Sequence, residues 1–169
     1  MDAYLAVVSK REVRSYADRP LPDEVVHRIL EAGRLAGSSQ NRQARRFVVL
    51  GRELADQLAQ SLYSPGNVRG AALAVAVVVR EGGQSGFDAG RAAQNMMIAA
   101  WNDGVGSSPN GVADREAFQR ALELEERERV AIVLSFGYPA RPADPRRRSA
   151  EEWIERADRL PFDSVVRWA

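Results

Sequence analysis

The hydrophobic pattern of residues 86–111 is the most informative in the chain. Between Ala89 and Asn102 it has no proline and almost no charge, and alanines or other apolar residues occur on every side. Such a pattern predicts a helix buried on all sides, with Asp88 as its N-cap and Gly104 as its C-cap. We expect residues 106–111, which follow it, to form a turn rich in backbone N–H groups.

Shorter patterns predict further elements on both sides of this helix. Helical spacing and capping residues predict helices at residues 1–9, 23–37, 53–62, 115–126 and 151–157. Apolar and β-branched runs predict strands at residues 46–50, 71–79 and 129–136, with a turn at 64–67, a break at 139–145 and an extended tail at 162–168. The valine and alanine run at 71–79 is typical of an interior strand covered on both faces. Helices interleaved with a few strands indicate an α+β fold.

Size and composition limit the function classes. The 169 residues predict a single soluble domain, residues 1–169, and the net charge of +1 gives no reason to expect nucleic acid or an acidic membrane as a partner. No apolar run reaches the roughly 20 residues that span a bilayer, and the N-terminus lacks a secretory pattern, so we expect a cytoplasmic protein. Without cysteine there is no thiol nucleophile and no thiolate metal site. The single histidine, His27, is expected on a helix surface.

A basic cluster near the N-terminus is the first candidate for chemistry. It consists of Lys10, Arg11 and Arg14, three cations within five residues. Arginine side chains bind phosphate oxygens bidentately, so this spacing suits one phosphate. The alternative interpretation is a solvated basic patch.

A polar loop and a glycine-containing turn are the other two candidates. The loop cluster could bind the hydroxyls or carbonyls of a ligand and consists of Ser38, Ser39, Asn41 and Gln43. Its alternative is a loop closed by local side-chain to backbone hydrogen bonds. The Asn110-Gly111 turn could present backbone N–H groups to a ligand, or be a plain loop after a core helix. Gln94 and Asn95 in the buried helix need partners, which a second subunit could supply.

The order of these features resembles the FMN-dependent nitroreductase family. The similar segments are K-R-E-V-R-S-Y at 10–16, L-P-D-E-V at 21–25, A-G-S-S-Q-N-R-Q at 36–43, R-F-V-V-L at 46–50 and F-D-A-G-R-A-A-Q-N-M-M-I-A-A-W at 87–101, then G-V-G, G-Y-P and R-L-P. The resemblance covers nearly the whole chain. It implies a nitroreductase-like α+β fold, with a central mainly antiparallel sheet flanked by helices, in an intertwined homodimer with an exchanged C-terminal tail.

The resemblance also implies an activity and a cofactor site. The protein would be an oxidoreductase that takes hydride from NAD(P)H through FMN and reduces a small electrophilic acceptor, such as a nitroaromatic or a quinone. No protein side chain is expected to act as acid or base. By position, the basic cluster would bind the FMN phosphate and ribityl chain together with Arg159, and the loop cluster would reach the flavin from the other subunit. The N–H groups of Asn110 and Gly111 would lie near the flavin N5 and O4, and the arginines at 146–148 would be surface charge.

Three features depart from the family pattern. Glu12 replaces a common serine and resembles the acidic residue of related flavin-cleaving enzymes that make dimethylbenzimidazole. Ala44-Arg45 replaces the usual Pro-Trp, which alters either the wall of the flavin pocket or its outer support. The chain is also shorter than many members on the substrate side, so the sequence does not identify the substrate. Oxygen-dependent flavin cleavage, or a flavin carrier or sensor without turnover, are the alternative functions.

Overall fold

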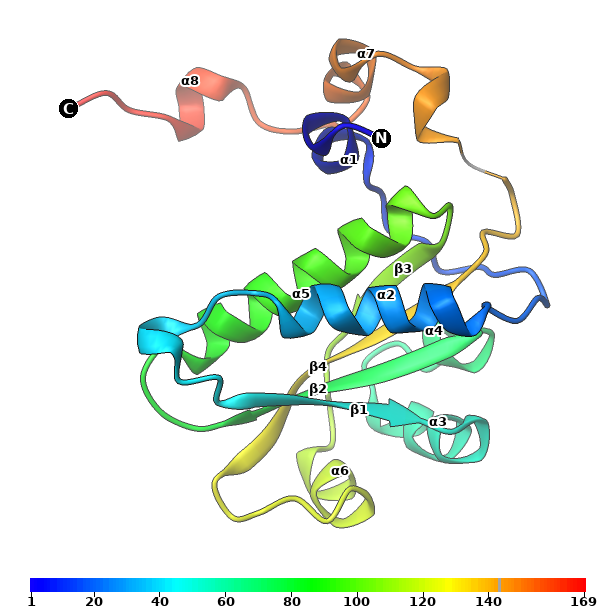
Figure 1. Ribbon diagram of the computed structural model, residues 1–169, viewed down its shortest axis with the longest axis vertical. Coiled ribbons are helices and arrows are strands. Elements are labelled where there is room, and N and C mark those ends of the chain that lie inside the picture. Colours follow the sequence, from blue (N-terminus) through cyan, green and yellow to red (C-terminus); the bar gives the residue numbers. More distant parts are fainter. Residues whose placement is uncertain (143) are drawn as a thin grey trace. The chain divides into compact units, whose positions relative to one another are not determined.

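The computed structural model describes residues 1–142 and 144–169 and divides into two compact units (Figure 1). The sheet unit is Arg11–Ala143, and the tail unit combines Met1–Lys10 with Asp144–Ala169. Each unit has its own secondary structure and is described by itself.

A four-stranded antiparallel sheet forms the centre of the sheet unit. Its order is β1 (Arg45–Leu50), β2 (Leu73–Arg80), β4 (Glu128–Gly137) and β3 (Gly106–Asn110). Every residue of β2 except Arg80 is buried, which confirms the predicted interior strand. This arrangement also confirms an α+β fold with an antiparallel sheet flanked by helices.

Two hydrophobic cores cover the two faces of the sheet, because side chains alternate along β2. Val75, Val77 and Val79 pack with α2 (Asp23–Arg34) and α5 (Ser85–Asn102), whereas Ala74, Ala76 and Val78 pack on the other face. That second face is covered by α3 (Arg52–Leu58), η2 (Ala59–Ser61), α4 (Gly66–Arg69) and α6 (Arg115–Ala121). In Figure 1, α2 and α5 lie on one side of the sheet and α3 and α6 on the other.

Helix α5 differs from its prediction at the start and in its burial. It begins at Ser85, so Asp88 lies within the first turn and is not the N-cap. Its carboxylate instead accepts hydrogen bonds from the Ser39 N–H at 3.1 and 3.3 Å. Within one chain the helix buries one face and exposes Arg91, Gln94 and Asn95, so burial on all sides is wrong for the isolated chain.

The end of α5 agrees with the prediction. Gly104 has a φ of 75°, its N–H donates to the Trp101 carbonyl at 3.1 Å, and the Val105 N–H donates to the Ala100 carbonyl at 2.9 Å. These two bonds form a Schellman motif, in which a left-handed glycine ends the helix.

Residues 106–111 were predicted as a turn, and this is wrong. Gly106–Asn110 forms strand β3, which pairs with β4 in a register that places Ser108 opposite Ser135. Its Ser and Pro residues have low strand propensity, but edge strands tolerate proline, and Pro109 lies exposed on the edge. Tertiary pairing with β4 therefore overrides local preference.

Smaller differences concern element ends. The helix predicted at 53–62 divides into α3 and η2, the turn predicted at 64–67 includes the start of α4, and the helix predicted at 115–126 ends at Ala121. Glu123, with a φ of 47°, cannot continue that helix. His27 is exposed on α2, as predicted. Of the predicted break at 139–145, Ala143 lies outside the described residues.

The tail unit is helical. It contains α1 (Ala3–Ser9), η3 (Pro145–Arg147), α7 (Ala150–Glu155) and α8 (Phe162–Val165). Ser149 and Glu152 form a capping box at the start of α7. The tail predicted as extended contains α8 instead, and it leaves large apolar side chains exposed at Leu160, Phe162, Val165 and Trp168. Among the described residues, no helix has the length and apolar character required to cross a membrane.

Candidate functional site

Residues 11–17 lie between β3 and the chain that follows β4. The Val13 N–H donates to the Ser107 carbonyl at 2.9 Å, and the Ala17 N–H to the Tyr138 carbonyl at 2.8 Å. A Cβ atom at Gly106 would lie 2.6 Å from Val13 Cβ, which is too close for any side chain. The glycine at the start of β3 therefore permits this segment, with Arg11 and Arg14, to lie against the sheet.

A buried hydrogen-bond network also holds the same segment against the sheet. The Tyr16 hydroxyl donates to the Val13 carbonyl at 2.7 Å and lies 3.0 Å from Ser135 Oγ. Asn110 Nδ2 lies 3.1 Å from that Ser135 oxygen and 3.1 Å from the Val133 carbonyl. Burial raises the pKa of Tyr16 to about 12, so its hydroxyl stays protonated even in alkaline solution.

The first hollow, of about 400 Å³, opens beside this segment. Its lining residues are Glu12, Val13, Arg14, Ser15, Pro139, Ala140 and Arg141. Arg14 and Arg141 are both exposed, and neither forms an ion pair with another described residue. Sequence reasoning did not identify Arg141, although its position two residues after the G-Y-P segment was a usable signal.

The loop cluster is closed by its own hydrogen bonds. Ser38 Oγ accepts from the Gln43 N–H at 2.9 Å, which is the local bonding considered as an alternative. Gln40, Asn41 and Gln43 have φ values of 52°, 53° and 50°. Such left-handed residues cost on the order of 1 kcal/mol each and persist where the surrounding structure requires them. The loop is thus held in a defined shape, with the side chains of Asn41 and Gln43 exposed.

The second hollow, of about 350 Å³, lies beside the loop cluster. Its lining residues are Ser38, Ser39, Gln84, Phe87, Asp88 and Arg91. Asp88 is only 8% exposed and its carboxylate is bound by the Ser39 N–H, whereas Phe87 is 64% exposed. The hollow therefore combines an apolar ring, a cation and a carboxylate that is already hydrogen-bonded.

The two hollows are lined by segments that are bound at opposite ends of α5. Ser39 is bound to Asp88 in the first turn of the helix, and Val13 is bound to Ser107, which follows the last turn. At about 1.5 Å per residue, the 18 residues of α5 span about 27 Å. Within one chain, the loop cluster and the arginines of residues 11–14 are therefore not brought together.

Asn110 and Gly111 have different surroundings. The Asn110 side chain is 2% exposed and belongs to the buried network with Ser135. Gly111 is partly exposed, and its carbonyl accepts from the Tyr63 N–H at 3.1 Å. The Tyr63 ring is 77% exposed, and its Cδ2 would lie 3.0 Å from a Cβ at Gly111. Of these two residues, only Gly111 is exposed enough for a ligand to approach, and it offers main-chain groups alone.

Two predicted site residues belong to the tail unit. Lys10 is partly buried, and Arg159 is exposed with its Nη1 donating to the Ala157 carbonyl at 2.7 Å. Their predicted contact with a phosphate remains a prediction. In the same unit Arg146 and Arg147 are exposed, as expected for surface charge, whereas Arg148 lies over the Trp153 ring at 5.1 Å.

Arg45, which departs from the family pattern, is hydrogen-bonded to the chain just before the loop cluster. Its Nη2 donates to the Ala36 carbonyl, while its Nε and Nη1 are buried without a partner in the described structure. Burial lowers the pKa of Arg45, and the nearby carboxylate of Asp88 opposes that shift. Of the two roles considered from the sequence, the geometry favours outer support of the loop.

Comparison with known proteins identifies the family to which this chain belongs. A family model described as "Nitroreductase family" matches residues 7–87 and 83–138. The chain therefore belongs to the nitroreductase family. Similar proteins include two named "Putative NADH dehydrogenase/NAD(P)H nitroreductase". The one from Archaeoglobus fulgidus is 30% identical over 95% of this chain and 94% of its own length. The one from Methanothermobacter thermautotrophicus is 29% identical over 90% and 88%.

Solved structures share the fold along the whole chain. A structure described as a putative nitroreductase in complex with FMN, from Desulfovibrio desulfuricans, is 27% identical with a TM-score of 0.83 and covers 98% of this chain and 96% of its own. A nitroreductase family protein from Clostridium difficile has a TM-score of 0.84 at 20% identity, and covers 99% and 98%. At that identity the second likeness concerns the fold alone.

Proposed function

We propose that this protein is an FMN-dependent oxidoreductase that takes hydride from NADH or NADPH and reduces a small electrophilic acceptor, such as a nitroaromatic or a quinone. The main support is the first hollow, in which Arg14 and Arg141 carry positive charge with no ion-pair partner among the described residues. The chain also belongs to a family with an FMN-bound member of the same fold.

The side chains of the first hollow fit the phosphate of FMN. Each guanidinium offers a planar fork of N–H donors that matches phosphate oxygens, and the Ser15 hydroxyl adds a further donor. Arg11 lies in the same segment as Arg14, and Lys10 and Arg159 remain predicted additional ligands. Glu12 also lines the hollow and would repel a phosphate, so it is expected to face away from the anion.

Bound FMN would accept hydride and pass two electrons on, while the chain binds and orients it. With a quinone acceptor the reaction balances as NAD(P)H, a proton and the quinone giving NAD(P)⁺ and the hydroquinone. We propose that the main-chain N–H of Gly111 lies near the flavin N5, where a fixed donor would stabilise the electron-rich ring without reorganising. No side chain is assigned as an acid or base.

We propose that the active form is a homodimer with exchanged C-terminal tails. One chain holds the loop cluster and the basic cluster at opposite ends of α5, so a second copy would be needed to place both against one flavin. Gln94 and Asn95 on α5 and the apolar side chains of Phe162, Val165 and Trp168 are exposed surfaces that a partner would cover. Obligate interfaces commonly bury on the order of 2,000 Å² or more.

The decisive experiment is the absorption spectrum of the purified protein, followed by a steady-state assay with NADH and NADPH. A flavin spectrum, FMN released on denaturation, and nicotinamide oxidation with a simple quinone are the expected results. Flavin without turnover would indicate a carrier or sensor, and oxygen-dependent loss of FMN with dimethylbenzimidazole as product would indicate flavin cleavage. Absence of flavin after reconstitution would refute the proposal.

Light scattering and a truncation test the dimer separately. The expected mass is that of two chains at micromolar concentration, and deletion of residues 162–169 should release flavin if the tail covers the other subunit. A monomer that retains FMN and turnover would contradict the dimer but not the oxidoreductase activity.

A further inference from the structure

The second hollow contains a cation whose charge the protein does not compensate. Arg91 lines the hollow, and among the described residues no carboxylate lies within ion-pair distance of its guanidinium. The guanidinium packs against the Gly37 backbone, where Nη2 would lie 2.6 Å from an added Cβ. Glycine at position 37 thus provides the space in which the Arg91 charge is held beside the hollow.

The neighbouring charges do not neutralise Arg91. Asp88 is the carboxylate of the hollow, and it is bound by the Ser39 N–H and lies near the Arg45 charge. Arg42 donates to Gln40 Oε1 at 2.6 and 3.1 Å, which satisfies two of its N–H groups but leaves its charge. The three arginines around the loop therefore share one carboxylate, and a further anion would be attracted there.

An aromatic ring lies next to this cation. Phe87 is on the same face of α5 as Arg91, four residues earlier, and the guanidinium carbon lies 5.7 Å from the ring centroid. The ring also lines the hollow and is 64% exposed, so its face is open to a ligand. An apolar plate beside a planar, bidentate donor suits a flat ligand that carries a carboxylate at one end.

We propose that the second hollow selects the acceptor, and that Arg91 binds the carboxylate of a flat aromatic acceptor whose ring packs on Phe87. This inference rests on the proposed function, because it names the acceptor class of the same reaction. Gly37 contributes by leaving room for the guanidinium, and Arg45 by offsetting the charge of Asp88.

The test compares 4-nitrobenzoate with its methyl ester, which differ in charge and share the reducible group. Arg91→Gln should lower kcat/KM for 4-nitrobenzoate by about tenfold, equal to about 1.4 kcal/mol, and change that for the ester by less than about twofold. Each substrate is compared between proteins, so the different intrinsic reactivities of acid and ester cancel. Arg34→Gln, which alters an exposed arginine paired with Glu31 on α2, should change neither value.

A second variant tests the geometry without removing the charge. Gly37→Ala should push the Arg91 guanidinium aside, because an added Cβ would overlap it. We expect kcat/KM for 4-nitrobenzoate to fall by less than in Arg91→Gln, again with little change in kcat/KM for the ester. High salt should lower kcat/KM for 4-nitrobenzoate relative to kcat/KM for the ester in the wild type, but not in Arg91→Gln.

A binding measurement separates this inference from the proposed function. Calorimetric titration of the oxidised holoprotein with benzoate should show a Kd about tenfold higher for Arg91→Gln than for the wild type. If neither substrate is reduced but the benzoate difference is found, the proposed function fails and the anion site stands. Equal losses for acid and ester, an unchanged benzoate Kd, or a monomer mass for Arg91→Gln would overturn the inference, the last because Arg91 would then bind the partner subunit.

Discussion

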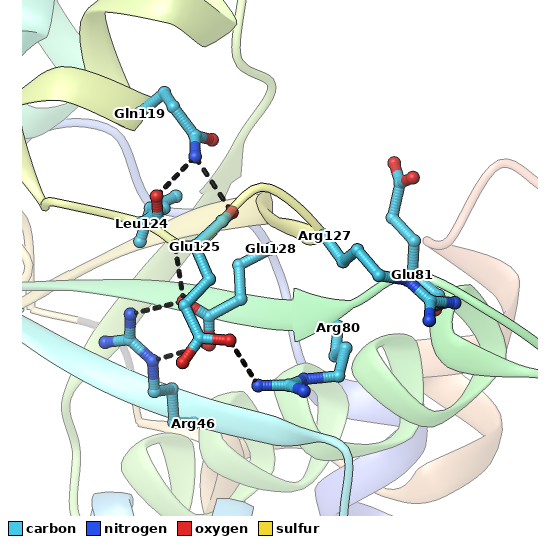
Figure 2. A network of polar contacts seen from close by, with 8 residues as sticks. All are labelled: Arg46, Arg80, Glu81, Gln119, Leu124, Glu125, Arg127 and Glu128. Carbon is cyan, nitrogen blue, oxygen red and sulfur yellow. Dashed lines mark hydrogen bonds and ion pairs between the residues drawn. The ribbon is translucent and has the colours of Figure 1, made fainter.

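Two groups of arginines in this protein differ in their partners. At the start of β4, Arg46 binds Glu128 through two hydrogen bonds of 2.8 and 3.0 Å, and Arg80 lies 2.5 Å from Glu125 (Figure 2). Beside the two hollows, Arg14 and Arg91 have no ion pair with a described residue. Arg46 and Arg80 are thus neutralised by carboxylates at or near the start of β4, whereas a cation without an ion pair beside a hollow attracts an anionic ligand.

Two neighbouring residues at the end of β3 differ in a similar way, because one is bonded within the protein and the other is open to a ligand. Asn110 uses its side chain within the buried network, whereas Gly111 exposes main chain next to Tyr63. A residue that maintains the fold and one that we propose to lie near the cofactor are thus neighbours in the chain. Stability and cofactor measurements on the same variants can separate the two roles.

The largest effect is expected on FMN affinity, when two arginines that would bind the phosphate are removed together. Arg11→Ala with Arg14→Ala should weaken FMN on the order of 100-fold or more, because each charge-assisted hydrogen bond contributes about 1.5–3 kcal/mol. Riboflavin, which lacks the phosphate, should lose little affinity. Fluorescence titration of the apoprotein with both ligands measures the difference, and the double variant Arg80→Ala with Arg120→Ala serves as a charge-matched control. Equal losses for FMN and riboflavin would show that Arg11 and Arg14 do not bind the phosphate.

The second prediction concerns the main chain near the flavin. Gly111→Val should slow flavin reduction by NAD(P)H on the order of tenfold or more, or expel the flavin, because a side chain there would displace the proposed donor. Stopped-flow absorbance of the flavin band follows this step. Circular dichroism should show that the fold is retained, since Gly111 lies outside the two cores. A variant with bound flavin and a wild-type reduction rate would place N5 elsewhere.

Asn110→Ala should show the opposite profile. Loss of the buried amide leaves the Ser135 hydroxyl and the Val133 carbonyl with fewer partners, at a cost of about 1–3 kcal/mol in the free energy of unfolding. Urea denaturation measures that loss, and the flavin reduction rate should change little because the proposed donor is main chain. A large kinetic effect with unchanged stability would assign Asn110 to the cofactor site.

The smallest effect is expected for the free energy of unfolding when the ion pair of Arg46 with Glu128 is removed. Hydrogen bonds from Arg46 hold the pKa of Glu128 at about 2, below its usual 4.5. The resulting stability is present above pH 4.5 and is lost as the pH falls toward 2. Glu128→Gln should therefore cost about 1 kcal/mol at pH 7, since Arg46 is half exposed, and almost nothing near pH 2. Thermal unfolding at both pH values tests this, and a cost independent of pH would contradict the ion pair as its cause.

The parts of the fold that were predicted correctly have strong local patterns. The buried strand at 71–79 and the glycine end of α5 follow from uninterrupted apolar residues and from the conformational freedom of Gly104. Strand β3 could not be predicted, because nothing local in Gly-Ser-Ser-Pro-Asn favours a strand and its pairing partner lies in β4. Arg141 was missed for a similar reason, since hydrogen bonds with the distant residues Ser15 and Ala17 bring its segment to the first hollow.

The sequence by itself determined the α+β class, the order of motifs that resembles the nitroreductase family, and the residue types able to bind a phosphate. These properties depend on composition and on spacing along the chain, which need no coordinates. Only the tertiary structure decided that Asp88 binds the Ser39 N–H rather than capping α5, and that Arg45 supports the loop from behind. It also decided that the loop cluster and Arg14 lie at opposite ends of α5. Hydrogen bonds and charges act through space, so their partners depend on which distant segments the fold brings together.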